Sequence, residues 1–394
     1  MRARPEPFGA WVRLDDVTLV AVGRDGARKL GISGGALWDD AGDAAAGGAR
    51  PPLEVHLAVT SRCGAGCKGC YLDATPDGEA PPFEVIAARL RAIAEAGAFT
   101  VAFGGGEPLT RADLGELGAL ARSLGLLPVV TTSGLGLTRA RAAGLRAFAQ
   151  VNVSYDGEGE GYAAVRGFDG APAAERAMRL LAEAGVPFGV NVVLTRASFP
   201  QLRRTIAAAA ALGAREAQLL RYKPAGRARS PEYLAARLDA AQVQELGPTL
   251  ERLSAEGLLP LRIDCALVPL LSARAISAAQ LARFGVLGCE AGRHLAAVRV
   301  DGAVAACSFG PASGTQAEAA WAEAGAGAGW EDDATLARWR APHEAEPCRS
   351  CDLRQVCRGG CRVVALHLAG GMAPDPECPR VRAHQAHRAA EAGR

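Results

Sequence analysis

The eleven cysteines of this 394-residue chain fall into two groups whose spacing suits iron–sulfur chemistry. The first group, Cys63, Cys67 and Cys70, is a Cys-x3-Cys-x2-Cys triplet just after the apolar stretch Val55–Val59. The second group lies beyond residue 260 and consists of Cys265, Cys289, Cys307, Cys348, Cys351, Cys357, Cys361 and Cys378. Cubane clusters are held by cysteine thiolates. A triplet leaves one iron open to another ligand, and eight thiolates complete two four-ligand clusters, so three [4Fe-4S] clusters use every cysteine.

Zinc is the competing interpretation of the same cysteines. Disulfides are uncommon in the cytosol, where closely spaced cysteines more often bind metal. The pair Cys348-x2-Cys351 alone fits half a zinc site. Zinc nevertheless gives no reason for an isolated triplet followed by the glycine-rich stretch Gly104–Gly106.

Composition narrows the classes of function. The formal net charge is +2 and 22% of the residues are charged, so no strong attraction to nucleic acid or to an anionic membrane is indicated. Residues Met1–Trp11 contain no apolar run typical of a secretory signal. The longest bland run, Ile206–Leu212, is far shorter than the roughly 20 apolar residues of a membrane span. We therefore expect a cytoplasmic protein without nucleic-acid or membrane partners.

Strand and helix patterns alternate through the middle of the chain. The predicted strands are Val55–Val59, Thr100–Phe103, Pro128–Thr131, Gln150–Ser154, Phe188–Leu194 and Ala217–Arg221. Between them, apolar residues recur at helical spacing, as at Ile86, Leu90 and Ile93. Six strand–helix units predict parallel strands covered by helices, an α/β fold that we expect to be a partial (β/α)6, TIM-like barrel.

Changes in composition suggest four parts. Residues 1–52 hold a small hairpin over Ala10–Val22 and a linker rich in Ala, Gly and Pro. Residues 53–260 form the barrel. Cysteine, glycine and proline rise together from Leu261, which predicts a loop-rich module over 261–380 organised by metal sites. Residues 381–394 are a polar tail.

The triplet follows the first strand, at the end of the sheet where barrel enzymes build their active sites. The triplet with Tyr71 after it resembles the signature of radical S-adenosylmethionine (SAM) enzymes. This resemblance implies that SAM binds the open iron through its amino and carboxylate groups. It also implies that reduction cleaves SAM to a 5′-deoxyadenosyl radical, which abstracts a hydrogen atom from the substrate.

Further motifs extend the resemblance. The stretch Gly104–Pro108 is similar to the family's Gly-Gly-Glu-Pro motif, which implies that Gly105, Gly106 and Glu107 bind SAM. The resemblance also implies that Tyr71, which follows the triplet, binds SAM. Ser133 stands in a Thr-Ser-Gly sequence where many relatives carry Thr-Asn-Gly. The stretch Ser154–Gly157 resembles a Ser-x-Asp-Gly motif, which implies that Ser154 and the later Arg166 hold the SAM carboxylate. Read without the family, the Asp156-Gly157 pair is a turn.

The cysteines beyond residue 260 resemble the seven-cysteine SPASM arrangement. The matching pattern is Cys289, Gly302-x4-Cys307, Cys348-x2-Cys351-x5-Cys357-x3-Cys361 and Cys378. It implies that Cys289, Cys307 and Cys361 share one auxiliary cluster, and that Cys348, Cys351, Cys357 and Cys378 hold another. Cys265 lies outside the pattern. We expect it to be the fourth ligand of the first auxiliary cluster, with Asp264 or an open iron as the alternative.

Enzymes of the SPASM group mostly modify peptides, so the resemblance implies a ribosomal precursor peptide that is crosslinked or altered at a C–H position. It also implies an external electron donor of the flavodoxin or ferredoxin type. The first fifty residues are too few for the leader-binding domain that many such enzymes carry, so leader recognition is expected from a separate protein or another surface.

Other functions stay open. A small molecule is an alternative substrate. Sulfatase maturases carry Asp directly after the cysteine equivalent to Cys307, where this chain has Ser308. An epimerase needs a spare cysteine, which exists only if Cys265 binds no iron. A non-catalytic electron carrier conflicts with the intact triplet and Gly-Glu motif. The basic stretch Arg221–Arg227 either contacts a peptide or is a solvated loop.

Overall fold

The computed structural model describes residues 2–393 except 7, 16–17, 40–49, 275, 287 and 318–327. Its centre is a sheet of ten strands in the order β10-β9-β8-β7-β6-β5-β4-β11-β12-β13. The parallel strands are β4 (Glu54–Thr60), β5 (Thr100–Gly105), β6 (Leu127–Thr132), β7 (Gln150–Ser154), β8 (Phe188–Leu194), β9 (Ala217–Arg221) and β10 (Leu261–Ile263). The six predicted strands are confirmed, and β10 is a further parallel strand that we did not predict.

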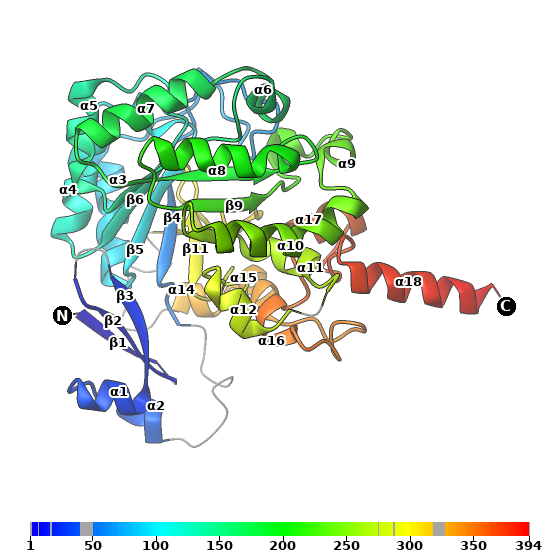
Figure 1. Ribbon diagram of the computed structural model, residues 1–394. Helices are drawn as coiled ribbons and strands as arrows, with labels where there is room; N and C mark the ends of the chain where they lie inside the picture. Colours follow the sequence, from blue (N-terminus) through cyan, green and yellow to red (C-terminus); the bar gives the residue numbers. More distant parts are fainter. Residues whose placement is uncertain are drawn as a thin grey trace.

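Each parallel strand turns one face toward the helices that cover the sheet (Figure 1). On β4, Val55, Leu57 and Val59 are almost fully buried under these helices. The covering helices are α3 (Phe83–Glu95), α4 (Leu114–Ser123), α5 (Arg139–Gly144), α6 (Glu160–Arg166), α7 (Ala171–Glu183), α8 (Leu202–Ala211) and α10 (Ala240–Glu256). Because side chains alternate along a strand, Glu54 and His56 point to the opposite, inner face and are only half-buried.

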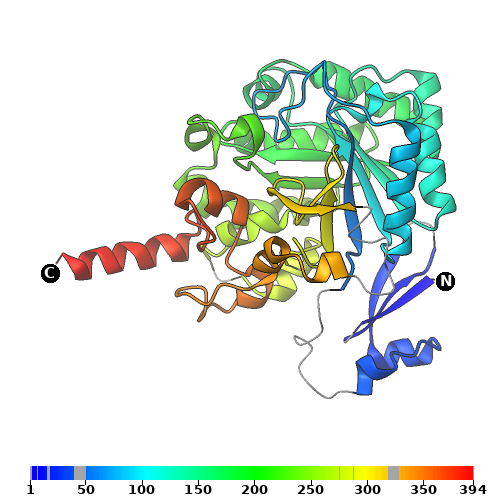
Figure 2. The same ribbon diagram turned by 180° about the vertical axis from the view of Figure 1, so that it is seen from behind.

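The chain beyond residue 260 continues the same sheet at both ends. Strand β10 pairs with β9, and β11 (Leu295–Val298) runs parallel to β4. Strands β12 (Ala303–Ala305) and β13 (Ala312–Gln316) follow beyond β11 in antiparallel order, and they are drawn in yellow and orange-yellow in the view from behind (Figure 2). The sheet thus crosses the boundary that we placed at residue 260, and a separate module over 261–380 stays a prediction.

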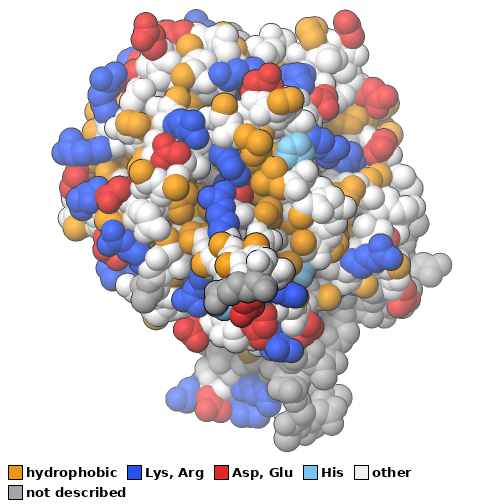
Figure 3. All heavy atoms as spheres, turned by 90° about the vertical axis from the view of Figure 1, so that its right-hand side faces the viewer, with side chains coloured by type: hydrophobic (Ala, Val, Ile, Leu, Met, Phe, Trp, Pro, Cys, Tyr) orange, Lys and Arg blue, Asp and Glu red, His pale blue; other side chains and the backbone are white. Residues whose placement is uncertain are grey.

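Short helices make up most of the remaining C-terminal part. They are α11 (Val268–Leu271), α12 (Ala278–Arg283), α14 (Ala328–Glu331), α15 (Ala334–Arg340), α16 (Arg354–Cys357) and α17 (Arg362–Ala369). The predicted polar tail is the greater part of a longer helix, α18 (Pro379–Ala392), which projects from the molecule (Figures 1 and 2). Acidic and basic side chains are mixed on the face from which α18 projects (Figure 3). None of the described helices is long and apolar enough to cross a membrane.

The N-terminal residues form a small sheet with its own core. Strands β1 (Arg2–Glu6), β2 (Gly9–Arg13) and β3 (Leu19–Gly23) are antiparallel in that order, followed by α1 (Arg24–Lys29) and α2 (Ala36–Asp39). Their core contains Ala10, Val12, Ala27 and Trp38. Strands β2 and β3 form a hairpin within the predicted stretch Ala10–Val22, of which positions 16 and 17, like most of the predicted linker, lie outside the described residues.

Candidate active site

The cysteine triplet lies in the loop that leaves β4. The backbone N–H of Cys63 donates to the carbonyl of Thr75 at 2.8 Å, and the N–H of Cys70 donates to the carbonyl of Cys67 at 3.3 Å. The three thiols are close enough for Cys67 and Cys70 to affect the pKa of Cys63, which burial raises. The loop therefore gathers three thiols at the carboxyl end of the sheet, and their role as iron ligands stays a prediction.

The glycine-rich end of β5 packs directly against the chain that leads into this loop. Gly105 has a φ of +113°, and a Cβ there would lie 2.1 Å from the carbonyl oxygen of Thr60. A Cβ on Gly106 would lie 2.4 Å from the carbonyl oxygen of Arg62. The N–H of Gly106 donates to Thr60 at 2.7 Å. Only glycine allows this close approach of two backbones. The glycine-rich motif therefore holds the triplet loop in position.

Glu107 joins the end of β5 to the end of β6. Its buried carboxylate accepts hydrogen bonds from the N–H of Leu109 at 3.0 Å and from the hydroxyl of Thr132 at 2.7 Å. The other oxygen accepts from the N–H and the hydroxyl of Ser133, at 2.8 and 2.5 Å. The structure thus brings the predicted residues Glu107 and Ser133 together, and contact of either with SAM stays a prediction.

Arg166 reaches the triplet loop from the last turn of α6. Its Nε donates to the fully buried Asp156 at 2.5 Å, and its carbonyl accepts from the N–H of Lys68 at 3.0 Å. Burial lowers the pKa of Arg166, and attraction by Asp156 outweighs that effect and raises it. Within the described part of the chain, no hydrogen bond is recorded for its two terminal nitrogens. Ser154 ends β7 and is buried, and contact of Ser154 or Arg166 with the SAM carboxylate stays a prediction.

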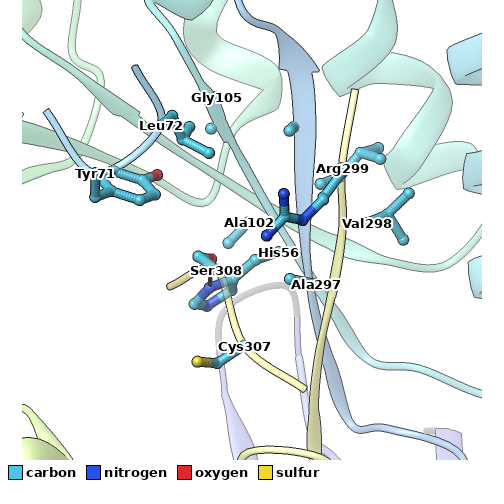
Figure 4. Close-up of a pocket in the computed structure, with 13 residues that line it drawn as sticks. His56, Tyr71, Leu72, Ala102, Gly105, Ala297, Val298, Arg299, Cys307 and Ser308 are labelled. Atoms are coloured by element: carbon cyan, nitrogen blue, oxygen red, sulfur yellow. Dashed lines mark hydrogen bonds between the residues drawn. The ribbon is translucent and has the colours of Figure 1, made fainter. Parts of the chain in front are cut away.

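A pocket with about 330 Å³ of empty space lies between the triplet side of the site and Cys307. It is lined by residues of β4, β5 and β11 together with Tyr71, Leu72, Cys307 and Ser308. Within it, His56 Nδ1 lies 2.7 Å from Ser308 Oγ and His56 Nε2 lies 2.9 Å from a Glu54 oxygen. Tyr71 and Arg299 reach toward this space from opposite sides (Figure 4).

His56 and Glu54 were missed by the sequence analysis. The signal that could have identified them is the alternation of polar Glu54 and His56 with apolar Val55 and Leu57. That alternation places both polar side chains on the inner face of the sheet.

The cysteines predicted to hold the first auxiliary cluster lie together. The thiols of Cys265 and Cys289 lie close enough to interact, which raises the pKa of Cys265 and lowers that of Cys289 to about 7. Burial raises the pKa of Cys307 to about 12, with added repulsion from Cys361 and Cys289. Cys265, which lies outside the SPASM pattern, is therefore placed beside a cysteine inside it. Asp264, the alternative ligand, instead forms a buried ion pair with Lys223.

The four cysteines predicted to hold the second auxiliary cluster also lie together. Cys348, Cys351, Cys357 and Cys378 all line a mostly apolar pocket with about 390 Å³ of empty space. No three His, Cys, Asp or Glu side chains within the described ranges converge on a point as the ligands of one metal ion do. The thiolates of a cubane bind different irons and need not converge on a point.

Known proteins with similar sequences place the chain in a family. The family model of the radical SAM superfamily matches residues 57–207. The PqqA peptide cyclase of Ruegeria pomeroyi is 30% identical over 355 residues, which cover 84% of this chain and 87% of that protein. The chain belongs to the radical SAM superfamily. The mycofactocin maturase MftC of Mycolicibacterium smegmatis is likewise 30% identical over 353 residues, covering 83% of this chain and 82% of that protein.

Solved structures share the fold of this radical SAM enzyme. Streptococcus suis SuiB bound to the precursor peptide SuiA has a TM-score of 0.70 at 17% identity and covers 96% of this chain and 98% of that one. The structure described as native anSMEcpe with bound AdoMet and a peptide has a TM-score of 0.60 at 18% identity, covering 87% of this chain and all of that one. Membership of the superfamily implies that the enzyme uses a [4Fe-4S] cluster and SAM.

The basic stretch after β9 is paired inside this radical SAM enzyme. Arg221 forms ion pairs with Asp375 at 2.6 Å and Glu377 at 2.7 Å, and all three side chains are buried. Lys223 pairs with Asp264. Arg227 donates from Nε to the carbonyl of Cys67 at 3.0 Å. The interpretation of this stretch as a solvated loop is therefore wrong for these three side chains.

An aromatic contact spans the space between the triplet and Cys307. The rings of Tyr71 and Phe309 lie 4.6 Å apart, and Lys223 Nζ lies 4.2 Å from the Phe309 ring centre on a cation–π contact. Burial raises the pKa of Tyr71 to about 12, so its hydroxyl is neutral at physiological pH. Phe309, two residues after Cys307, thus packs between a side chain of the triplet loop and a buried cation.

Proposed function

We propose that this radical SAM enzyme modifies a ribosomally made precursor peptide at an unactivated C–H position. The pocket between Tyr71, Gly105 and Ser308 is the observation that carries the proposal, because it borders both the predicted SAM motif and the cysteine Cys307. The names of the similar proteins, PqqA peptide cyclase and mycofactocin maturase, support the same class of substrate. The product that we expect is a side-chain crosslink or another C–H modification.

Two auxiliary [4Fe-4S] clusters form part of the proposal. One of them is supported by the mostly apolar pocket described above, because an apolar space with four thiols suits a buried cluster. The four thiols are those of Cys348, Cys351, Cys357 and Cys378. The contact between Cys265 and Cys289 supports the other, with Cys307 and Cys361 as the remaining ligands. The buried cation Lys223 lies near Cys265 and Cys361 of this cluster site and would offset the negative charge of their thiolates.

The residues around the triplet fit SAM as a ligand. SAM supplies the radical when bound, and the protein's part is to hold it in place. Arg166 has nitrogens left to donate to a carboxylate, and Ser154 adds a hydroxyl at the same end of the sheet. Gly105 and Gly106 leave that strand end without side chains. Tyr71 packs on Phe309 and would shield the pocket from water.

Partners follow from this chemistry. An external electron donor of the flavodoxin or ferredoxin type would reduce the cluster, and we expect the reaction to take place in the cytoplasm. Leader recognition is assigned to a separate binding protein. A second candidate is the outer edge of β3, which pairs with no other strand in the described residues and can accept an extended peptide.

The test is an anaerobic assay of the reconstituted enzyme with SAM and dithionite. We expect 5′-deoxyadenosine to form, and a variant with Cys63, Cys67 and Cys70 changed to Ala to form none while keeping about two-thirds of the iron. Peptides encoded by short reading frames beside the gene are then added, and a modified peptide that has lost two hydrogens indicates a crosslink. Absence of 5′-deoxyadenosine from enzyme with full iron content would show that the protein is an electron carrier.

A further inference from the structure

His56 stands in a space that its neighbours leave open. The register of the sheet places Ala102 of β5 and Ala297 of β11 directly beside it on the two adjacent strands. Both are small, and all three line the pocket. The imidazole is therefore the only large side chain at this level of these three strands, and its side chain is 33% exposed to the pocket.

The two ring nitrogens of His56 have different partners. Nε2 faces the Glu54 carboxylate at 2.9 Å, and Nδ1 faces the Ser308 hydroxyl at 2.7 Å. Burial raises the pKa of Glu54, and its hydrogen bond with His56 together with the attraction of Arg262 lowers it more, so Glu54 is an anion. An anion accepts a hydrogen bond and cannot donate one. Nε2 must then carry the proton, which leaves Nδ1 as an acceptor for the hydroxyl of Ser308.

We propose that Ser308 and His56 form the proton acceptor of the reaction, with Glu54 as the group that orients His56. This inference rests on the proposed function. A substrate radical formed by loss of a hydrogen atom becomes a neutral, oxidised product when it loses one electron and one proton. An oxidised auxiliary iron–sulfur cluster, held by the proposed ligands Cys265, Cys289, Cys307 and Cys361, would supply the oxidant that takes up the electron. The proton passes to Ser308 Oγ as the Ser308 proton moves to His56 Nδ1, which leaves an imidazolium beside the Glu54 carboxylate.

The position of Ser308 brings the proposed electron acceptor and the proposed proton acceptor close together. Its neighbour in the chain, Cys307, is one of the proposed ligands of the first auxiliary cluster, and both residues line the pocket. A substrate atom next to Ser308 would therefore be close to the electron acceptor and the proton acceptor at once. A serine without a base would not serve, because an alcohol is a very weak proton acceptor. The hydrogen bond to His56 supplies that base, as in other serine–histidine pairs.

A purely structural role of His56 makes a different prediction from the relay. Glutamine at this position can donate to Glu54 and accept from Ser308, so His56→Gln keeps both hydrogen bonds and removes only the ability to take up a proton. If His56 had only a structural role, the His56→Gln variant would keep its activity. The relay predicts that the rate of peptide modification falls by about 100-fold or more, the usual contribution of a general base.

A second variant tests the route through Ser308. In the His56→Gln background, Ser308→Asp places a carboxylate where the proton leaves the substrate, so peptide modification should recover. His367→Gln is the matched control, since His367 packs on Tyr233 at 5.7 Å and lies outside the pocket. Full activity of His56→Gln would overturn the relay. So would a lack of recovery in the double variant if its clusters give the wild-type electron paramagnetic resonance spectrum.

A further readout needs no peptide. In enzyme labelled with ¹⁵N-histidine and held with oxidised clusters, the His56 resonances are those missing from the His56→Gln spectrum. They should show a proton on Nε2 and none on Nδ1, and the opposite tautomer would overturn the relay. If wild-type enzyme forms 5′-deoxyadenosine but modifies no peptide, the proposed substrate is wrong, and the tautomer still tests the relay.

Discussion

Arg221 is the side chain whose loss should damage the enzyme most without touching a cysteine. It ends β9, its side chain is 3% exposed, and it pairs with Asp375 and Glu377, which are 0% and 6% exposed. It also donates to the carbonyl of Ala266 at 2.9 Å. Asp375 in turn accepts from the backbone N–H of Cys361 at 3.0 Å. A single guanidinium thus links the strand to two segments that carry predicted cluster ligands.

The change Arg221→Met removes the charge and keeps most of the side-chain volume. It leaves two buried carboxylates with Arg237 as the remaining cation in contact with Glu377. Removing one partner of a buried ion pair costs about 3–5 kcal/mol, because the other charge stays buried without compensation. That is a large share of the about 5–15 kcal/mol by which a typical domain is stable. The position of Cys361 should be disturbed as well, since Asp375 holds its backbone.

The assay is anaerobic urea unfolding together with the iron content of the reconstituted protein. We expect Arg221→Met to unfold at a lower urea concentration and to lose iron from the auxiliary sites, while the SAM-binding site keeps its iron. Arg237→Met is the matched control, since its side chain is 25% exposed and its pair should contribute only about 1 kcal/mol or less. If Arg221→Met retains full iron and the stability of the control variant, the reasoning about this buried ion pair is refuted.

Three further predictions use other contacts. Gly105→Ala should lower the free energy of unfolding by about 2 kcal/mol or more and reduce SAM cleavage, because its Cβ would overlap Thr60. Gly136→Ala is the control: with a φ of +74° and open space around it, it should show only the smaller cost of backbone strain. Glu107→Gln should cost about 1–3 kcal/mol in urea unfolding, since an amide cannot accept all four hydrogen bonds; wild-type stability would contradict this. Burial lowers the pKa of His294 to about 4 from 6.5, so the unfolded chain binds a proton first as pH falls. Between pH 7.5 and 5.5 wild-type protein should therefore lose about 1 kcal/mol of stability that His294→Gln does not lose, and equal slopes of stability against pH would contradict this.

The parts of the fold that repeat along the sequence were predictable. Strands such as Phe188–Leu194 are mostly apolar and buried along nearly their whole length, and helices between them show apolar spacing. Strand β10 was missed because it has only three residues, too few for a pattern. Strand β11 was missed because Leu295–Val298 is short and half alanine, and its pairing with β4 joins segments far apart in sequence. Such pairings depend on tertiary packing more than on local preference.

Part of the candidate site was likewise predictable from local patterns in the sequence, and part was not. The cysteine triplet and the glycine-rich motif are local patterns, and the sequence predicted their positions at the ends of β4 and β5. The contact between His56 and Ser308 joins residues 252 positions apart, and no local pattern encodes it. Alternation along β4 shows that His56 faces inward. It cannot show that a loop after β12 brings a hydroxyl to the ring.

The stretch 221–227 shows why its charges could not be interpreted from sequence. Arg227 binds the carbonyl of Cys67, Lys223 pairs with the residue before Cys265, and Arg221 binds the carboxylate that holds the backbone of Cys361. One short segment therefore contacts the triplet loop directly and is linked, through Asp264 and Asp375, to the first auxiliary set of cysteines. Clusters held by thiolates carry negative charge, and buried negative charge needs nearby cations. With the proposed clusters bound, these basic side chains would offset part of that charge in addition to pairing with their carboxylates, and we expect substrate recognition from the pocket around His56.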